Sequence, residues 1–287
     1  MKMLVTGATG KLGKKVVEHL LKTVPAGQLS VSVRNPEKAE NLRALGVDVR
    51  QGDFDVPESL DSAFAGVDRM LLISADGDNE TRIRQHTNAV KAAVRAKVGF
   101  IAYTSLANAQ DSKLFLAPTH QETEKAIMKT GIPYAFLRNN WYLENEISSV
   151  QGVLTGAPWV TSAGSGKVGW ASQQDYAEAA AAVLSGTGHE NTIYELSGKP
   201  LSQEELATAV GKVLGKEVSV QQVDDATYAE IMKNTGVPDF VIPMLVSIQQ
   251  GIREGNLEIE SDDFEKVLGR PLTSLDDALR QLVRTLS

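Results

Sequence analysis

Three glycines close to the amino terminus constrain this chain more than any other feature of its 287 residues. They lie in the run Thr-Gly-Ala-Thr-Gly-Lys-Leu-Gly, residues 6–13, between an apolar stretch at 3–6 and a helical pattern at 12–21. In such a turn the first glycine permits a sharp bend, the second lets the backbone approach a pyrophosphate, and the third lets helix and strand pack closely. The N–H groups at the helix start then bind phosphate. The turn predicts a dinucleotide-binding unit; the alternative is a merely tight turn.

Short apolar runs alternate with helical patterns through the first 140 residues. Strands are expected at 3–6, 29–33, 47–50, 70–73, 100–104 and 134–137, with helices at 12–21, from about 36, at 58–64, around 83–94 and at 119–129. Parallel strands need a crossover helix, and right-handed crossovers produce a doubly wound sheet. We therefore predict an α/β fold with a doubly wound parallel sheet, a Rossmann domain.

The regular alternation of strand and helix patterns ends after residue 141. Glycines and a proline between 152 and 169 predict a loop or hairpin, followed by an alanine-rich helix at 175–184 capped by Asp175 and a strand at 193–196. Ser202 and Glu205 form a capping box, and a mostly helical remainder ends in an amphipathic segment at 275–286. The expected division is a Rossmann domain over 1–150, completed by about 175–196, and a smaller, mostly helical C-terminal lobe on the substrate side over 151–174 and 197–287.

The residues expected to bind the cofactor lie at the carboxyl ends of strands. The turn contributes its backbone, from Gly7, Ala8, Thr9, Gly10, Lys11, Leu12 and Gly13. After the second strand, residues 32–35 contain no acid, whereas an NAD site usually carries Asp or Glu there for the ribose 2′-hydroxyl. The guanidinium of Arg34 instead suits a 2′-phosphate, which favours NADPH; the alternative is a solvent-facing arginine.

Further cofactor contacts are expected after the third, fourth and fifth strands. Asp53 is placed to reach the adenine edge, or it is an ordinary turn or N-cap aspartate. Ile73, Ser74 and Thr104 end strands whose carboxyl ends face the ligand crevice in this architecture, so we expect them to flank the cofactor.

Composition narrows the function classes. The chain has no cysteine, which removes thiolate nucleophiles, and its four histidines are too scattered for a metal cluster, so no metal is expected. The net charge of −7 and the lack of a basic run argue against nucleic acid as a partner. We find no signal core and no apolar stretch long enough to span a bilayer, so a cytoplasmic location is expected.

Several motifs together resemble the atypical, NmrA-like branch of the short-chain dehydrogenase/reductase superfamily. They are the glycine turn at 5–13, Val-Arg-Asn-Pro at 33–36, Phe-Ile-Ala-Tyr-Thr-Ser at 100–105, and Gly-Ile-Pro-Tyr through Leu-Arg-Asn-Asn-Trp-Tyr at 131–142. Within that branch the chain looks most like type-2 NAD(P)H:quinone oxidoreductases and bacterial triphenylmethane dye reductases. The resemblance covers nearly the whole chain and implies a Rossmann fold and a nicotinamide cofactor.

The chain departs from the wider superfamily at the catalytic dyad. Other members pair a serine with Tyr-x-x-x-Lys, and Ser105 is roughly where that serine belongs. No tyrosine here is followed four residues later by lysine; the corresponding helix reads His-Gln-Glu-Thr-Glu-Lys at 120–125. Because reduction of a ketone needs a positioned acid, an alcohol dehydrogenase or sugar epimerase is not expected.

Acceptor contacts are expected just after the sixth strand. Trp141 and Tyr142 are placed to stack on a planar acceptor, and Asn139 and Asn140 to hydrogen-bond it. In the resembling reductases this segment approaches the nicotinamide end of the cofactor. The resemblance therefore implies that Asn139 and Trp141 also contact the cofactor. The alternative is that one aromatic belongs to the core and both asparagines are turn residues.

The catalytic group is left open between three candidates, His120, Asn140 and Tyr142, and His86 is a further candidate for the substrate side. For both histidines the alternative is a packing or surface role. The leading hypothesis is NADPH-dependent reduction of a quinone or similar conjugated acceptor, which needs no strong acid. The rival is a non-catalytic NADP(H)-binding redox sensor of the NmrA type. Both hypotheses, the reductase and the sensor, leave an oligomeric state open.

Overall fold

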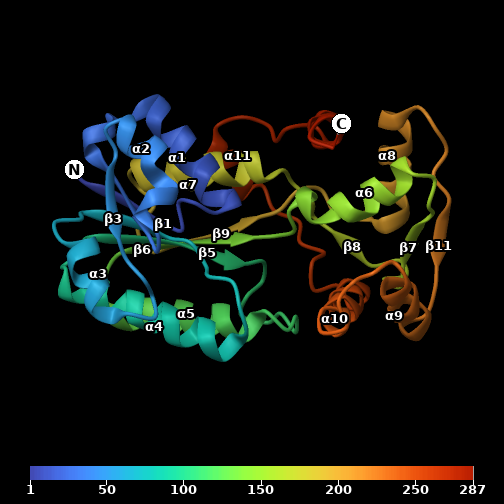
Figure 1. Cartoon of the computed structure of the whole chain (residues 1–287), viewed down its shortest axis with the longest axis horizontal. Helices are drawn as coiled ribbons and strands as arrows, with labels where there is room; N and C mark the ends of the chain where they lie inside the picture. Colours follow the sequence, from blue (N-terminus) through green and yellow to red (C-terminus); the bar gives the residue numbers. More distant parts are fainter. Residues whose placement is uncertain (287) are drawn as a thin grey trace.

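The structure, a computed structural model, describes residues 1–286 (Figure 1). Seven parallel strands form one sheet in the order β3-β2-β1-β4-β5-β6-β9. The strands are β1 (Met3–Thr6), β2 (Leu29–Val33), β3 (Asp48–Gln51), β4 (Arg69–Leu72), β5 (Phe100–Leu106), β6 (Tyr134–Asn139) and β9 (Thr192–Leu196). The order reverses between β1 and β4, which is the mark of a doubly wound sheet. The predicted Rossmann architecture is therefore confirmed.

Helices cover both faces of this sheet (Figure 1). One face carries α1 (Lys11–Thr23), α2 (Glu40–Ala44), α7 (Gln173–Ser185) and α11 (Asp263–Leu268), and the other carries α3 (Pro57–Phe64), α4 (Asn79–Arg95) and α5 (Ala117–Thr130). Short 3-10 turns, η1 (Ala26–Gln28) and η2 (Pro36–Ala39), flank β2. Buried apolar side chains fill the space between each helical layer and the sheet.

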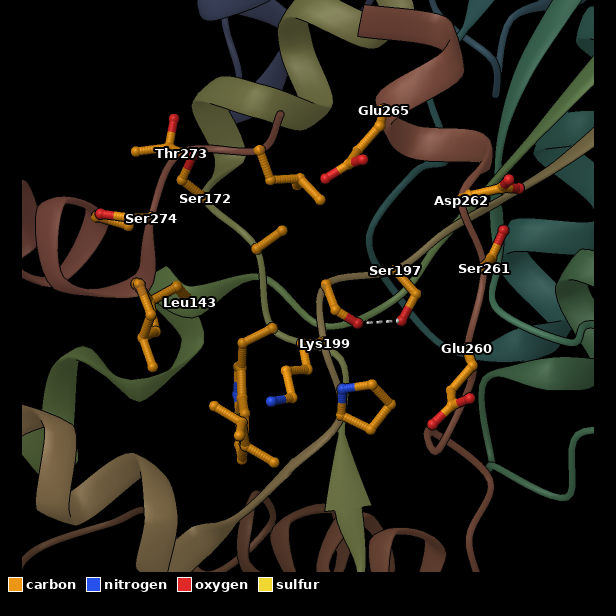
Figure 2. Close-up of a pocket in the computed structure, with 18 residues that line it drawn as sticks. Leu143, Ser172, Ser197, Lys199, Glu260, Ser261, Asp262, Glu265, Thr273 and Ser274 are labelled. Carbon is orange, nitrogen blue, oxygen red and sulfur yellow. Dashed lines mark hydrogen bonds between the residues drawn. The ribbon is translucent and has the colours of Figure 1, made fainter. Parts of the chain in front are cut away.

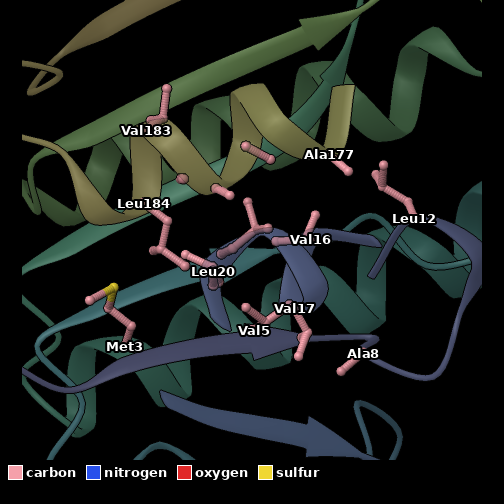
Figure 3. Packing of buried hydrophobic residues seen from close by; sticks show 14 of the residues in the cluster. Met3, Val5, Ala8, Leu12, Val16, Val17, Leu20, Ala177, Val183 and Leu184 are labelled. Carbon is pink, nitrogen blue, oxygen red and sulfur yellow. The ribbon is translucent and has the colours of Figure 1, made fainter. Parts of the chain in front are cut away.

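The alanine-rich helix α7 packs closely against α1. Ala177 and Ala180 are buried and small, so the two helices approach closely, while Val16 and Leu20 of α1 fill the space between them (Figure 3). Burial of each large aliphatic side chain contributes about 1.5–3 kcal/mol. This contact holds the start of α1, and with it the glycine turn, against the end of β1.

The remaining elements form a lobe beyond the carboxyl end of the sheet (Figure 1). Its strands pair as β8 (Lys167–Val168) with β10 (Leu201–Ser202), antiparallel, and β7 (Trp159–Thr161) with β11 (Val220–Gln222), parallel. Its helical elements are η3 (Leu143–Glu146), α6 (Ile147–Leu154), α8 (Gln203–Leu214), α9 (Asp225–Asn234), α10 (Ile242–Arg253) and α12 (Leu275–Arg284). A core that includes Trp159, Trp170 and Leu206 holds them together. The Ser202–Glu205 capping box opens α8 as predicted.

Local structure differs from the prediction at three places. Helix α6 occupies residues expected to start an irregular region; β-branched residues and Gly152 weaken its propensity, but Val150 and Val153 are buried in the lobe, and packing overrides propensity. No hairpin forms between 152 and 169, because β7 and β8 pair with strands from later in the chain. The helix expected from residue 36 is a 3-10 turn followed by the five residues of α2.

A further correction concerns the cap of α7. The N-cap is Ser172, whose side chain accepts a hydrogen bond from the Asp175 backbone N–H. The Asp175 carboxylate is buried and instead accepts hydrogen bonds from Arg270 at 2.7 Å and from the Thr273 hydroxyl at 2.9 Å. This aspartate therefore fastens the C-terminal segment to α7 rather than capping the helix.

Within residues 1–286 no helix is long and apolar enough to cross a membrane.

Candidate active site

The carboxyl ends of β1, β2, β4, β5 and β6 meet at one edge of the sheet, facing the lobe (Figure 1). Most of the residues predicted to bind the cofactor lie along this edge. In open parallel sheets, ligands bind in the crevice outside the carboxyl ends, at the point where the strand order reverses. Here that point lies between β1 and β4.

The glycine turn has the geometry that its spacing predicts. Gly7 has a φ of 63°, which favours glycine, and its carbonyl accepts a hydrogen bond from the Gly10 N–H at 2.9 Å. A Cβ on Gly13 would lie 2.3 Å from the Gly7 carbonyl oxygen, so only glycine lets α1 approach the turn this closely. Gly10 is the N-cap of α1 and no side chain caps the helix. The first-turn N–H groups are thus free of side-chain partners, an arrangement that suits a phosphate.

The turn residues divide into buried and exposed sets. Gly7, Gly10 and Lys11 are exposed and Thr9 is half-buried, whereas Ala8, Leu12 and Gly13 are buried. The side chains of Ala8 and Leu12 belong to the core between sheet and helices. These two residues can offer a ligand only their backbone.

Ile73, Ser74 and Thr104 are brought next to this turn. The side chain of Ile73 lies 3.6 Å from the position of a Cβ on Gly7, and its backbone N–H donates to Thr6 Oγ1 of β1 at 2.9 Å. The Ser74 N–H donates to Thr104 Oγ1 at 2.9 Å. The ends of β1, β4 and β5 are therefore tied together by side-chain hydroxyl groups.

Arg34 follows β2 and is exposed. Among the described residues it has no hydrogen-bonding or ion-pair partner. A free guanidinium at the crevice edge, with no acid beside it, fits a 2′-phosphate better than a ribose hydroxyl.

Asp53 is half-buried in the turn after β3. Its Oδ1 accepts a hydrogen bond from the Asp55 N–H at 2.9 Å, the pattern of an Asx turn. The turn role is thus present, and the adenine contact stays a prediction.

Residues 139–142, at the end of β6 and just beyond it, pack in different directions. Trp141 packs against the core of the lobe, whereas Tyr142 packs against the core of the sheet. The Tyr142 hydroxyl accepts from Asn139 Nδ2 at 3.0 Å, and its ring contacts Tyr176 edge-on. Burial raises the pKa of Tyr142 to about 12. The two aromatics do not share a face, so only one of them can stack on a given acceptor.

Both asparagines carry a buried carbonyl oxygen without a hydrogen-bond donor among residues 1–286. Asn140 Nδ2 donates to Ser197 Oγ and to the Leu257 carbonyl, both at 3.0 Å, which joins the end of β6 to the lobe. Buried acceptors are normally satisfied. The Oδ1 atoms of Asn139 and Asn140 are therefore two unpaired buried acceptors at the end of β6.

His86 lies between the sheet and the helices below it. It is 1% exposed; its Nε2 accepts from the Ala75 N–H at 2.9 Å, so Nδ1 carries the proton toward Thr123 Oγ1 at 2.8 Å. Burial and the nearby Arg82 charge lower the pKa of His86 to about 3. This imidazole is neutral and fully occupied, which favours its packing role over contact with a substrate.

His120 is held in the same layer. Its Nδ1 lies 2.9 Å from the Tyr103 hydroxyl and its Nε2 3.2 Å from Arg82 Nη2, and the residue is 6% exposed. Burial, and secondly the charge of Arg82, lower the pKa of His120 well below its ordinary value. The imidazole is neutral, and both of its ring nitrogens have partners within the protein. It is therefore not placed to donate a proton to an acceptor.

A buried ion-pair network occupies the place of the missing dyad. Ser105 Oγ donates to Glu124 Oε1 at 2.6 Å, and Arg138 grips the same carboxylate through Nε at 3.0 Å and Nη2 at 2.8 Å. The remaining guanidinium nitrogen, Nη1, donates to Glu195 Oε1 at 3.0 Å. The serine is thus committed to a carboxylate instead of a tyrosine. Sequence reasoning missed this network, although Glu124 lies one helical turn after His120.

A family model confirms what these motifs indicate. The model described as the NmrA-like family matches residues 1–271.

The chain belongs to the NmrA-like family.

Among curated members similar to this NmrA-like chain is quinone oxidoreductase 2 of Escherichia coli strain K12, 43% identical over 279 residues, which are 97% of each chain. The solved triphenylmethane reductase of Citrobacter sp. complexed with NADP(H) is 42% identical, with a TM-score of 0.94 over 98% of this chain and 100% of that one. The NADPH complex of the E. coli quinone oxidoreductase has a TM-score of 0.93 at 42% identity, over 98% and 99% of the two chains. The likeness therefore extends over both the sheet and the lobe.

Two cavities of this NmrA-like chain lie beside the strand ends rather than along them. One of about 620 Å³ lies between the start of α7, the segment after β9 and residues 260–275. Figure 2 shows Lys199 within it, with Glu260, Asp262 and Glu265 on one wall. The other, of about 470 Å³, lies between α1, α7 and α12 and includes Lys11. Except for Lys11, none of the predicted site residues lines either cavity.

Sequence reasoning also missed Glu146, at the end of η3. Its Oε1 accepts a hydrogen bond from Trp170 Nε1 at 3.1 Å, and no lysine or arginine within residues 1–286 pairs with it. Burial raises the pKa of Glu146 to about 7, although the indoles of Trp170 and Trp141 act in the opposite direction. Burial of a single glutamate has no sequence signature, because it depends on how η3 docks on the lobe.

Glu146→Gln is expected to stabilise the protein at alkaline pH only. The folded-state pKa of about 7 exceeds the ordinary 4.5, so the stability linked to this proton is present below about pH 4.5 and is lost as pH rises through 7. Because the side chain is only half-buried, screening limits the gain to about 1 kcal/mol at pH 8. Urea unfolding at pH 4.5 and pH 8 measures it; an equal gain at both values would contradict the assignment.

Proposed function

We propose that this chain is an NADPH-dependent reductase that passes a hydride to a quinone or a similar conjugated acceptor. The observation that carries the proposal is its full-length likeness, at 42–43% identity, to a quinone oxidoreductase and a dye reductase that bind NADP(H). The glycine turn and the unpaired Arg34 at the same crevice edge support it from this chain's own residues.

The residues present fit the cofactor. The backbone of residues 7–13 would hold the diphosphate, Arg34 the 2′-phosphate, and Ile73, Ser74 and Thr104 would flank the nucleotide along the ends of β4 and β5. Asn139, with its unpaired buried carbonyl oxygen, would accept a hydrogen bond from an amide donor. When bound, NADPH supplies the hydride, and the protein supplies orientation and electrostatics.

The acceptor class follows from the state of the two groups at the position of the missing dyad. Ser105 is committed to Glu124, and His120 is neutral and engaged on both nitrogens. Reduction of a simple ketone needs a positioned proton donor, whereas a quinone or a cationic dye takes hydride into a delocalised system and leaves protonation to water. Proximity on the nicotinamide then provides most of the acceleration. Trp141 is the aromatic available on the lobe side to stack on such an acceptor.

Oxidation of NADPH in the presence of a panel of quinones and dyes tests the proposal. We expect turnover with at least one conjugated acceptor and none with simple ketones. No turnover with any acceptor, together with equal affinity for NADP⁺ and NADPH by calorimetry, would instead favour a redox sensor, because a sensor needs binding without chemistry.

A further inference from the structure

Arg82 is a buried cation without a carboxylate partner. It lies on α4, is 5% exposed, and forms no ion pair with any acid of residues 1–286; its Nε also lacks a hydrogen-bond acceptor. Arg138, the comparable buried arginine, is paired with two glutamates. An unpaired buried charge is costly, so the fold retains Arg82 at the expense of stability.

The contacts of Arg82 place its charge directly behind the crevice edge. Nη2 donates to Ser74 Oγ at 2.8 Å, and Ser74 is the half-buried residue that follows β4 and hydrogen-bonds Thr104. The same Nη2 faces Nε2 of His120, a neutral acceptor that does not cancel the charge. Of the two acidic groups that act on Arg82, Tyr103 is a buried, neutral phenol, and Asp76 is exposed and screened by water.

We propose that Arg82 determines the charge class of the acceptor: acting through Ser74, it favours acceptors on which hydride transfer creates a negative charge. This inference rests on the proposed function. Arg82 is a positioning residue, since Ser74 rather than Arg82 borders the crevice.

The two acceptor classes differ in the sign of the charge that the reaction changes. In quinone reduction the C4–H bond of the dihydronicotinamide breaks, its hydrogen and electron pair move to the quinone, and the neutral quinone becomes a hydroquinone monoanion that water then protonates. In reduction of a triphenylmethane cation the same hydride forms a C–H bond at the central carbon, and the cation becomes neutral. A fixed positive charge stabilises the first product and repels the second substrate.

Removal of the charge should therefore move the two activities in opposite directions. We expect Arg82→Gln to lower kcat/KM for a neutral benzoquinone by about tenfold or more and to leave unchanged or raise kcat/KM for malachite green. Arg82→Lys, which keeps the charge, should retain most of the quinone preference. Arg95→Gln on the exposed far end of α4, paired with Asp61, is the matched control and should change neither activity.

A purely structural role would lower both activities by a similar factor, and that outcome would overturn the inference, as would an unchanged quinone activity. Arg82→Met is the second neutral variant if Arg82→Gln does not fold.

Binding without cofactor provides an independent readout. By calorimetry, Arg82→Gln should weaken binding of 4-nitrophenolate about tenfold without weakening malachite green; equal losses overturn the inference. If the wild-type protein neither binds NADPH nor reduces either acceptor, the proposed function itself fails. Wild-type turnover with no discrimination in the variants removes only the role of Arg82.

Discussion

Gly13→Ala is expected to weaken NADPH binding at least about 100-fold. The new Cβ would lie 2.3 Å from the Gly7 carbonyl oxygen, 2.8 Å from the Gly7 carbonyl carbon and 2.9 Å from Ala8 Cα. All three atoms are backbone, so no side chain can rotate away, and α1 must move off the turn or the turn must open. Either movement displaces the N–H groups proposed to hold the diphosphate. Quenching of tryptophan fluorescence on titration with NADPH measures the loss.

Gly27→Ala is the matched control for this substitution. A Cβ at Gly27 would meet no heavy atom within 4 Å, so the same chemical change should leave NADPH affinity and the unfolding midpoint as they are. A Gly13→Ala protein that is folded and binds NADPH like the wild type would show that the glycine turn does not hold the cofactor.

Arg34→Ala is expected to weaken NADPH binding by about 10- to 100-fold while changing NADH affinity little. The guanidinium is exposed and has no partner within residues 1–286, so its loss costs no intramolecular contact and stability should not change. Only NADPH carries the 2′-phosphate that a guanidinium can hold through two parallel hydrogen bonds. Calorimetric titration with both nucleotides separates this effect from a general loss of binding.

The salt dependence of binding adds a second criterion. Wild-type affinity for NADPH should fall more steeply with salt than that of Arg34→Ala, because one charge pair is lost in the variant. Arg43→Ala, an exposed arginine of α2 that pairs with Glu40, is the control for removal of a nearby positive charge. Equal losses of NADPH and NADH affinity in Arg34→Ala would remove Arg34 from the proposed 2′-phosphate site.

Secondary structure was predictable where local pattern and packing agree. The six strands expected before residue 141 are all present, each within about two residues of its expected bounds, because buried parallel strands are short apolar runs between glycine and helix signals. Helix α6 was missed, since Ile147, Val150 and Val153 bury a helical face whose sequence has low intrinsic helix propensity. Its existence depends on the lobe that it packs against.

The candidate site divides in the same way. The geometry of the glycine turn and the lack of an acid beside Arg34 could be predicted from the sequence, because each depends on residues within one strand–turn–helix unit. The sequence could not predict that Trp141 and Tyr142 face opposite ways. Each ring packs against a different hydrophobic core, and both cores are assembled from residues far apart in the chain.

For this chain, local spacing was sufficient to predict the strand–helix order of the first 140 residues, the geometry of the glycine turn and the absence of a Tyr-x-x-x-Lys dyad. Tertiary structure alone decided which charges are paired: Arg138 pairs with glutamates 14 and 57 residues away, whereas Arg82 pairs with no carboxylate of residues 1–286. The physical reason is how far along the chain the deciding interactions extend. In most segments of this chain, residues a few positions apart set the backbone conformation, with α6 as an exception. The electrostatic state of a buried group instead depends on every element packed around it.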